Sequence, residues 1–389
     1  MNSTKYYFDY NATTPTDSRV LEAMLPFFSD NFHNPSSFYR QAGDARDAID
    51  KARENVAKLL NADPKEIYFT GGGTESDNLA IFGVVSRYRE KGNHIITSAI
   101  EHPAVLKSFE FLAKKGFETT LLPVDKYGLV DPSDLEKSIK DSTILITVMH
   151  ANNEIGTLQP ITQLAKIAHK KGIYFHTDAV QAVGKIPVDV KALDVDMLSF
   201  SSHKIYGPKG IGVFYKKNKV KIDPMIFGGG HENGLRAGTE NVPGIVGIGK
   251  AAELALLEMA DEEKRIRPLR DKIQKGIIER IPEILINGDT DQKLYNTLNV
   301  SLRYIEGEAI LAMMDHEGFS LSSGSACSSK SLDPSHVLLA LGLKHEDAHG
   351  SLRISLGKYN TEDDVDHLLD VLPGVAAHLR RMSPFWDKK

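Results

Sequence analysis

Short apolar runs and amphipathic stretches alternate between residues 66 and 201, and this alternation constrains the fold more than any other feature. The apolar runs predict strands at 66–70, 94–97, 119–123, 144–148, 174–177 and 197–200. The amphipathic stretches predict helices at 74–88, 105–115, 133–139 and 161–171. Because parallel strands need a crossover connection, usually a helix, we expect an α/β fold whose mainly parallel sheet is covered on both faces.

The pattern changes after the three glycines at 228–230. A long helix rich in Glu, Lys and Arg is predicted at 245–280. Shorter elements follow it: strands at 296–301 and 352–356, and helices at 308–315, 336–341 and 362–380. We therefore expect a large domain over 16–260, a smaller α+β domain over 261–389, and an N-terminal segment, 1–15, that packs with the small domain.

The composition of the 389-residue chain narrows the classes of function. Its net charge of −5 provides no broad basic field for nucleic acid. No apolar run approaches the about 20 residues of a membrane span, and the start lacks a signal-peptide apolar region, so we expect a cytoplasmic protein without a membrane segment. The single cysteine, Cys327, excludes an intrachain disulfide and a cysteine-rich metal site.

Lys204 lies just beyond the predicted strand at 197–200 and before a Gly-Pro-Lys-Gly turn. Ligands of α/β folds bind at the carboxyl ends of the strands. A lysine amine held there, with its pKa lowered, can form a Schiff base with a carbonyl compound. The alternative is a surface turn with two ordinary lysines, Lys204 and Lys209.

Glycine-rich residues 71–73 follow one strand and precede a helix that begins near Thr74. Free N–H groups at a helix start favour a phosphate, although Thr74 could instead be a simple N-cap. Arg236–Asn241 is a second polar, glycine-containing stretch, which includes Thr239. Alone it is a loop, and together with the other motifs it could supply phosphate donors across a dimer interface.

Other polar residues follow the remaining predicted strands. His102 could stack on a planar cofactor, or be structural. Asn153 could contact a ring hydroxyl, or only make a turn. Asp178 is costly to bury unless its charge is paired, and a protonated heteroaromatic nitrogen is a suitable partner. Gln181 could reach an oxygen on the same ring.

Two candidates lie in the predicted small domain. Cys327 is either a small core residue or a reactive thiol, and its serine- and glycine-rich neighbours favour the exposure that a nucleophile needs to reach its substrate. Arg353 stands on a strand, where it makes either a surface ion pair or a fork-shaped clamp for an amino acid carboxylate.

The motifs Ser-x-His-Lys-Ile-Tyr-Gly-Pro-Lys-Gly at 201–210 and Ser-Ser-Gly-Ser-Ala-Cys at 322–327 resemble those of NifS/IscS-type cysteine desulfurases. The resemblance extends from the Asp-Tyr-Asn-Ala-Thr-Thr-Pro run at 9–15 to the run at 357–362. These are homodimeric pyridoxal-phosphate enzymes of the class V aminotransferase family, with fold type I, the aspartate-aminotransferase fold. The resemblance implies conversion of L-cysteine to L-alanine, with a persulfide passed to an iron–sulfur scaffold protein or another acceptor.

The same resemblance implies a role for each candidate residue. Lys204 matches the Schiff-base lysine, and His102 matches the histidine that stacks on the ring. Cys327 matches the cysteine that forms the persulfide, and it is also a candidate transient cluster ligand. The implied ring contacts are Asp178, Gln181 and Asn153. The implied phosphate contacts are Gly73, Thr74, Ser201, Ser202 and His203, with Thr239 lent by the other subunit. The implied substrate-carboxylate contacts are Arg353 and Asn11.

Three features depart from the common pattern: the glycine triplet at 71–73, Ala237 where serine is frequent, and His231 where glutamine is common. Two alternatives share part of the motif set. An aminotransferase or selenocysteine lyase would use the same cofactor residues, and an aminotransferase would not need Cys327. A non-enzymatic sulfur carrier with this fold would hold no cofactor.

Overall fold

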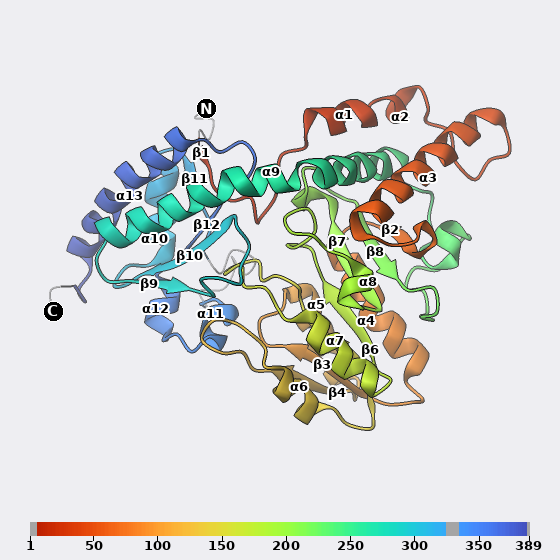
Figure 1. The fold of residues 1–389 in the computed structure, drawn as a ribbon, viewed down its shortest axis with the longest axis horizontal. Coiled ribbons are helices and arrows are strands. Elements are labelled where there is room, and N and C mark those ends of the chain that lie inside the picture. Colours follow the sequence, from red (N-terminus) through yellow and green to blue (C-terminus); the bar gives the residue numbers. More distant parts are fainter. Residues whose placement is uncertain (1–5, 324–333, 387–389) are drawn as a thin grey trace.

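The computed structural model describes residues 6–323 and 334–386, and its larger part is built on a seven-stranded sheet (Figure 1). The strand order is β2-β8-β7-β6-β5-β3-β4. The strands are β2 (Ile67–Thr70), β3 (His94–Ser98), β4 (Glu118–Leu122), β5 (Thr143–Thr147), β6 (Tyr174–Asp178), β7 (Met197–Ser201) and β8 (Gly212–Lys216). The α-helices of this part are α1 (Ser18–Met24), α2 (Pro26–Ser29), α3 (Arg40–Leu60), α4 (Gly73–Tyr88), α5 (Pro103–Lys114), α6 (Pro132–Ser138), α7 (Ile161–Lys170) and α8 (Val190–Leu193).

The prediction of a mainly parallel sheet is confirmed. Strands β3 to β7 pair in parallel, and only β8 runs antiparallel to its neighbours β7 and β2. Successive residues of a strand point to opposite faces. On β7, Met197 joins the apolar cluster that includes α4 and α5 side chains, whereas Leu198 joins the one that includes α3 and α7. Helices therefore cover both faces of the sheet.

The smaller part contains a three-stranded sheet of order β12-β10-β9, with antiparallel pairs. Its elements are β9 (Ile284–Asn287), β10 (Thr297–Leu302), α10 (Gly307–His316), β11 (Phe319–Ser320), α11 (His336–Ala340), α12 (His345–His349), β12 (Ser351–Ser355) and α13 (Glu362–Met382). Strand β1 (Tyr6–Tyr7) pairs in parallel with β11, and Phe8 is buried in the apolar cluster of this part. The beginning of the described chain is thus packed against its end.

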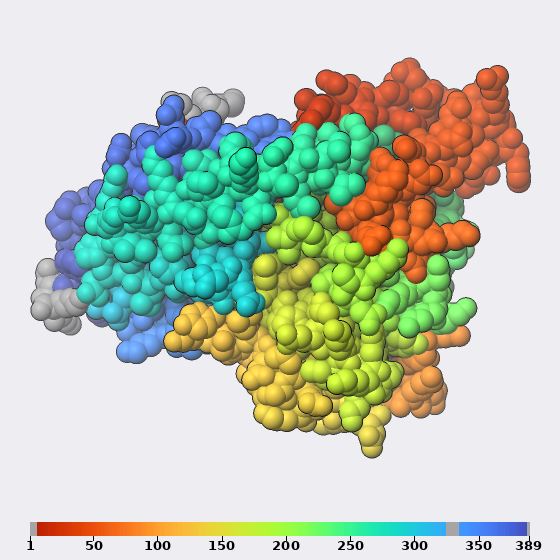
Figure 2. Space-filling model, in the orientation of Figure 1, coloured from red at the N-terminus to blue at the C-terminus, as the bar shows by residue number. Residues whose placement is uncertain are grey.

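Helix α9 (Val242–Arg280) joins the two parts (Figure 1). Ile245 and Ile248 lie in the larger apolar cluster, and Ile273 and Ile277 lie in the smaller one. Figure 2 shows the outer surface of this segment extending from beside α13 toward the N-terminal helices. The helix crosses residue 260, where the sequence suggests a domain boundary. None of the described helices is long and apolar enough to span a membrane.

Candidate active site

The carboxyl ends of the parallel strands bring several sequence-predicted residues to one edge of the sheet. Asp178 is the last residue of β6, and Ser201 is the last residue of β7. A short 3-10 helix, η2 (Ser202–Lys204), follows β7 directly and carries the lysine. Because β6 and β7 are parallel neighbours, these residues lie on adjacent strand ends.

Lys204 is half-buried and its amine faces the N-terminal segment. Its Nζ donates to the main-chain carbonyls of Asn11 at 2.6 Å and Ala12 at 2.7 Å. The positive charge of Lys204 lowers the pKa of both His102 and Asp178, so the amine lies within electrostatic reach of both side chains. The alternative of an ordinary surface lysine does not fit this position.

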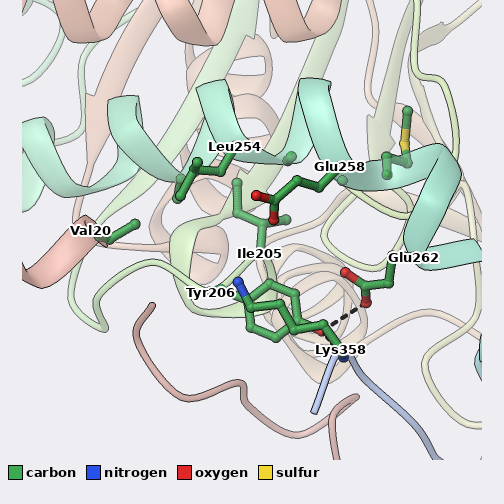
Figure 3. Close-up of a pocket in the computed structure, with 11 residues that line it drawn as sticks. Val20, Ile205, Tyr206, Leu254, Glu258, Glu262 and Lys358 are labelled. Atoms are coloured by element: carbon green, nitrogen blue, oxygen red, sulfur yellow. Dashed lines mark hydrogen bonds between the residues drawn. The ribbon is translucent and has the colours of Figure 1, made fainter. Parts of the chain in front are cut away.

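A small cavity lies on the other side of the turn that carries Lys204, and Tyr206, Glu262 and Lys358 are among the residues that line it (Figure 3). Tyr206 has a left-handed backbone with φ of 63°, and its hydroxyl donates to Glu262 Oε1 at 2.8 Å. The hydroxyl also accepts from the Lys358 N–H at 2.8 Å. Tyr206 therefore links the lysine turn to α9 and to the small part.

Asp178 is a buried carboxylate with few compensating contacts. One oxygen accepts the Val180 N–H at 2.8 Å. Burial raises the pKa of Asp178 to about 6, while the Val180 hydrogen bond and the Lys204 charge act in the opposite direction. A cation placed beside this carboxylate would offset the cost of burying it. The site can therefore take a protonated ring nitrogen.

His102 is the N-cap of α5, and its Nδ1 accepts the Ala104 N–H at 3.1 Å. That hydrogen bond places the ring proton of the neutral form on Nε2. Burial, and then the Lys204 charge, lower the pKa of His102 to about 4. At neutral pH the ring is therefore an uncharged, flat surface with an orientation fixed by the start of α5.

The start of α4 forms an open pocket of about 590 Å³. Among its lining residues are Gly73, Thr74, Ser201, His203 and Lys209. The N-cap of α4 is Gly72, with no side-chain cap, so the first N–H groups of the helix are available to a ligand. The buried hydroxyl of Ser202 has no hydrogen-bond partner among the described residues. These features suit an anion such as phosphate.

Asn11 connects the lysine to the opposite side of the site. Its Nδ2 donates to the Asn153 carbonyl at 3.1 Å, and its own carbonyl accepts from Gln181 Nε2 at 2.9 Å. The Asn153 carbonyl also accepts from Arg353 at 3.1 Å. One hydrogen-bond network therefore contains Asn11, Asn153, Gln181, Lys204 and Arg353.

Arg353 is buried on β12, where it is 3 % exposed. Its NH2 atom pairs with Asp9 Oδ1 at 2.7 Å. Its Nε is buried and has no partner among the described residues. The surface ion pair considered from the sequence is therefore replaced by a buried guanidinium, held by Asp9, with donor capacity left for a carboxylate.

The structure does not bring two of the sequence-predicted residues, Thr239 and Cys327, to this site. Thr239 is exposed on the segment after the 3-10 helix η3 (His231–Gly234) and does not line the α4 pocket of its own chain. Cys327 lies outside the described residues. Within the part of the chain that the structure describes, no group of three or more His, Cys, Asp or Glu could hold a metal ion.

The structure adds buried polar residues that the sequence reasoning did not select. Asp77 lies in α4 with Oδ1 at 3.8 Å from His176 Nε2, and burial, followed by the charge of Asp178, raises its pKa. Glu101 accepts from Ser98 Oγ at 2.5 Å. Lys185 is 6 % exposed. Each is one ordinary polar residue in the sequence, and only tertiary packing brings it to the site.

We expect Asp178→Asn to lower turnover by roughly a hundredfold, because a neutral amide cannot balance a cation that the carboxylate stabilises. The amide oxygen can still accept the Val180 N–H, so folding should be retained. The rate of amino acid turnover measures the effect. Asp196→Asn is the matched control, since Asp196 is also buried but bonds His169 and Phe175 elsewhere. Equal losses in both variants would contradict the assigned role.

Comparison with known proteins identifies the family of the chain. The family described as Aminotransferase class-V matches residues 6–368. A protein of Clostridium botulinum named cysteine desulfurase IscS is 53% identical over 98% of this chain and 96% of its own length. A protein of the same name from Dictyoglomus turgidum is 54% identical over 97% of this chain and 96% of its own length.

Solved structures give the same result. A NifS-like protein is 41% identical, with a TM-score of 0.91 over 97% of this chain and 100% of that one. A structure described as SspA in complex with cysteine is 40% identical, with a TM-score of 0.81 over 92% of this chain and 100% of that one. The chain therefore belongs to the class-V aminotransferase family, among its cysteine desulfurases of the IscS type.

Proposed function

We propose that this protein is a cysteine desulfurase that converts L-cysteine to L-alanine and leaves a persulfide on Cys327. One observation carries the proposal: the Lys204 amine, the buried Asp178 carboxylate and the uncapped start of α4 lie at the same edge of the sheet. This set suits a ring cofactor with a phosphate, a basic ring nitrogen and a reactive carbonyl. The names of the relatives support the desulfurase reaction over the related aminotransferase reaction.

The residues present fit pyridoxal phosphate, on which this family depends. Gly73, Thr74, Ser201, Ser202 and His203 would hold the phosphate; all of them except Ser202 line the α4 pocket, and the Ser202 hydroxyl is buried without a hydrogen-bond partner among the described residues. His102 would cover one face of the ring, while Asp178 would pair with its nitrogen. Asn153 and Gln181 would contact its edge. When bound, this cofactor supplies an electron sink for bond breaking on the amino acid.

Lys204 and Cys327 would divide the chemistry between them. Lys204 Nζ takes the α-proton of L-cysteine, and its present acceptors, the Asn11 and Ala12 carbonyls, orient it. Cys327 attacks the substrate sulfur as a thiolate, so the substrate C–S bond breaks and an S–S bond forms on Cys327. A proton delivered to the former β-carbon and return of the α-proton from Lys204 to the α-carbon complete L-alanine. His102 is our candidate for the base that ionises Cys327, and it would take the proton at Nδ1, which now accepts the Ala104 N–H.

Arg353 and Asn11 would bind the carboxylate of the substrate. Arginine to carboxylate contacts are charge-assisted and often bidentate, which fixes orientation as well as affinity. Arg353 NH1 and Asn11 Nδ2 both donate to the Asn153 carbonyl, so the two side chains lie together, and the Nε of Arg353 has no partner among the described residues. The bound cysteine named for a solved structure of similar fold supports L-cysteine as the substrate.

We expect Arg353→Lys to raise the KM for L-cysteine about tenfold or more, with a smaller change in kcat. Lysine keeps the positive charge but loses the fork that matches a carboxylate, and a charge-assisted hydrogen bond contributes about 1.5–3 kcal/mol. Steady-state kinetics with L-cysteine measure the effect. Arg380→Lys is the control, because Arg380 is equally buried but bonds the Arg303 and Glu283 carbonyls. An unchanged KM in Arg353→Lys would refute the clamp.

A second copy of the chain would complete the phosphate site through Thr239. Glu232 forms an ion pair with Arg53 of α3 at 2.7 Å, so the segment before Thr239 lies beside α3. Phe38, which lies just before α3, and Phe227, which lies just before η3, are 104% and 83% exposed. Burying such side chains against a second copy would be favourable, which supports a homodimer.

We further propose residues 16–260 as the cofactor-binding domain, 261–389 as the small domain with Cys327, and 1–15 as the segment packed with it. The recipient of the persulfide sulfur would be an iron–sulfur scaffold protein or another acceptor, with Cys327 as a candidate transient cluster ligand. A reactive thiol works where thiols are kept reduced, which supports a cytoplasmic location.

The direct test is an assay of the purified chain with L-cysteine, pyridoxal phosphate and dithiothreitol. We expect L-alanine and sulfide in equal amounts, because each persulfide is released by the reductant. 3-Mercaptopyruvate with a new amino acid when a keto acid is added, or pyruvate and ammonia in place of L-alanine, would overturn the proposal in favour of transamination or another lyase reaction.

A further inference from the structure

Lys185 is a buried lysine that the proposed reaction does not use. It follows Gly184, whose φ of +76° turns the chain back toward Gln181. Its Nζ donates to the Gln181 side-chain Oε1 at 3.1 Å and to the Gln181 carbonyl at 3.2 Å. Burying an amine is costly unless it makes such contacts, and both of these contacts are to one residue.

The other end of the Gln181 amide faces the active-site lysine. Gln181 Nε2 donates to the Asn11 carbonyl, and the same carbonyl accepts from Lys204 Nζ. If the amide were rotated by half a turn, its NH2 group would face the Lys185 amine and its oxygen would face the Asn11 carbonyl. The contact between the two oxygens would then be repulsive, and so would the contact between the NH2 group and the charged Lys185 amine, so charged Lys185 selects one orientation of the amide.

We infer that Lys185 is a positioning residue that fixes the Gln181 amide with its N–H donors toward the cofactor side of the site. The inference rests on the proposed function, in which Gln181 contacts the cofactor ring. Burial, and then the charge of Lys204, lower the pKa of Lys185 to about 7, whereas Glu262 raises it. The charged and the neutral amine both carry N–H donors, so either form can hold Gln181 Oε1.

The test compares holoenzymes of the wild type and Lys185→Met. Methionine has a similar length but no donor, so the Gln181 oxygen loses its partner. We expect Lys185→Met to lose pyridoxal phosphate about fivefold faster during dialysis, which is the effect of losing about one hydrogen bond. We also expect a shift of the visible absorption maximum. Lys216→Met is the matched control: Lys216 is also buried, but its Nζ bonds the main-chain carbonyls of Val220 and Lys217.

A double-mutant cycle separates positioning from general structure. In a Gln181→Ala background, Lys185→Met should add no further cofactor loss and no further spectral shift. An effect of equal size in both backgrounds would overturn the inference, as would a wild-type spectrum and wild-type retention in Lys185→Met. Lys185→Gln provides a second variant if the methionine chain does not fold.

The outcome is distinct from a failure of the proposed function. If the wild type binds pyridoxal phosphate but makes no L-alanine, the desulfurase proposal falls, while coupling between Lys185 and Gln181 in the spectra would still support the positioning role. If the wild type is active and the two residues show no coupling, only the positioning role falls.

Discussion

Lys204→Arg is expected to lower L-alanine formation by about a thousandfold or more, since general base catalysis alone contributes 10²–10⁴ and arginine cannot give up its proton. Arginine keeps the positive charge that faces Asp178 and His102, and it can still donate to the Asn11 and Ala12 carbonyls. The substitution therefore removes proton transfer and bond formation at Nζ while it preserves the local electrostatics. Initial rates with L-cysteine measure the loss.

Lys204→Ala supplies the complementary experiment. It removes both the amine and its charge, and a small primary amine added to the buffer should restore part of the activity by occupying the space of the side chain. A Lys204→Arg variant with wild-type rates would show that charge alone suffices, and it would contradict the assignment of Lys204 as the base.

Cys327→Ser is expected to abolish both L-alanine and sulfide production, because an alcohol at neutral pH is far less nucleophilic toward sulfur than a thiolate. The described residues on either side of Cys327 are fixed at the site. The main-chain carbonyl of Ser322 accepts the main-chain N–H of Arg353 at 2.7 Å. Ser335 Oγ donates to Glu154 Oε2 at 2.5 Å. Both ends of the intervening segment are therefore anchored beside the proposed carboxylate site.

The visible absorption band of bound pyridoxal phosphate should be unchanged in Cys327→Ser, since no cofactor contact is assigned to Cys327. Mass spectrometry of the wild type after L-cysteine should show one added sulfur, and the variant should show none. Full turnover by Cys327→Ser would mean that the sulfur leaves by another route, as in a lyase or an aminotransferase.

Most of the sheet could be predicted because strands such as β3, β5 and β6 are apolar and buried and are separated by helices of regular period. Strand β8 was missed for a physical reason. It follows β7 after the lysine turn and pairs with it in antiparallel fashion, so it needs no crossover helix. The run from Gly212 to Lys216 is also short and carries no flanking helical pattern.

The positions of the site candidates at strand ends could be anticipated from the sequence, since parallel strands end on a common edge. Their partners could not. Asp9 pairs with Arg353 across 344 residues, and no local pattern identifies such a contact. Lys185 is one of many lysines in the sequence, and only its burial against Gln181 distinguishes it.

Helix α9 makes the two parts of the molecule mechanically dependent on each other. Its first turns are held by one apolar cluster and its last turns by the other, and a break at residue 260 would expose four N–H and four C=O groups that the helix now pairs. Melting of either half would fray the element that the other half packs against. The chain should therefore lose its structure in one cooperative step, and neither half would be a stable protein when produced alone.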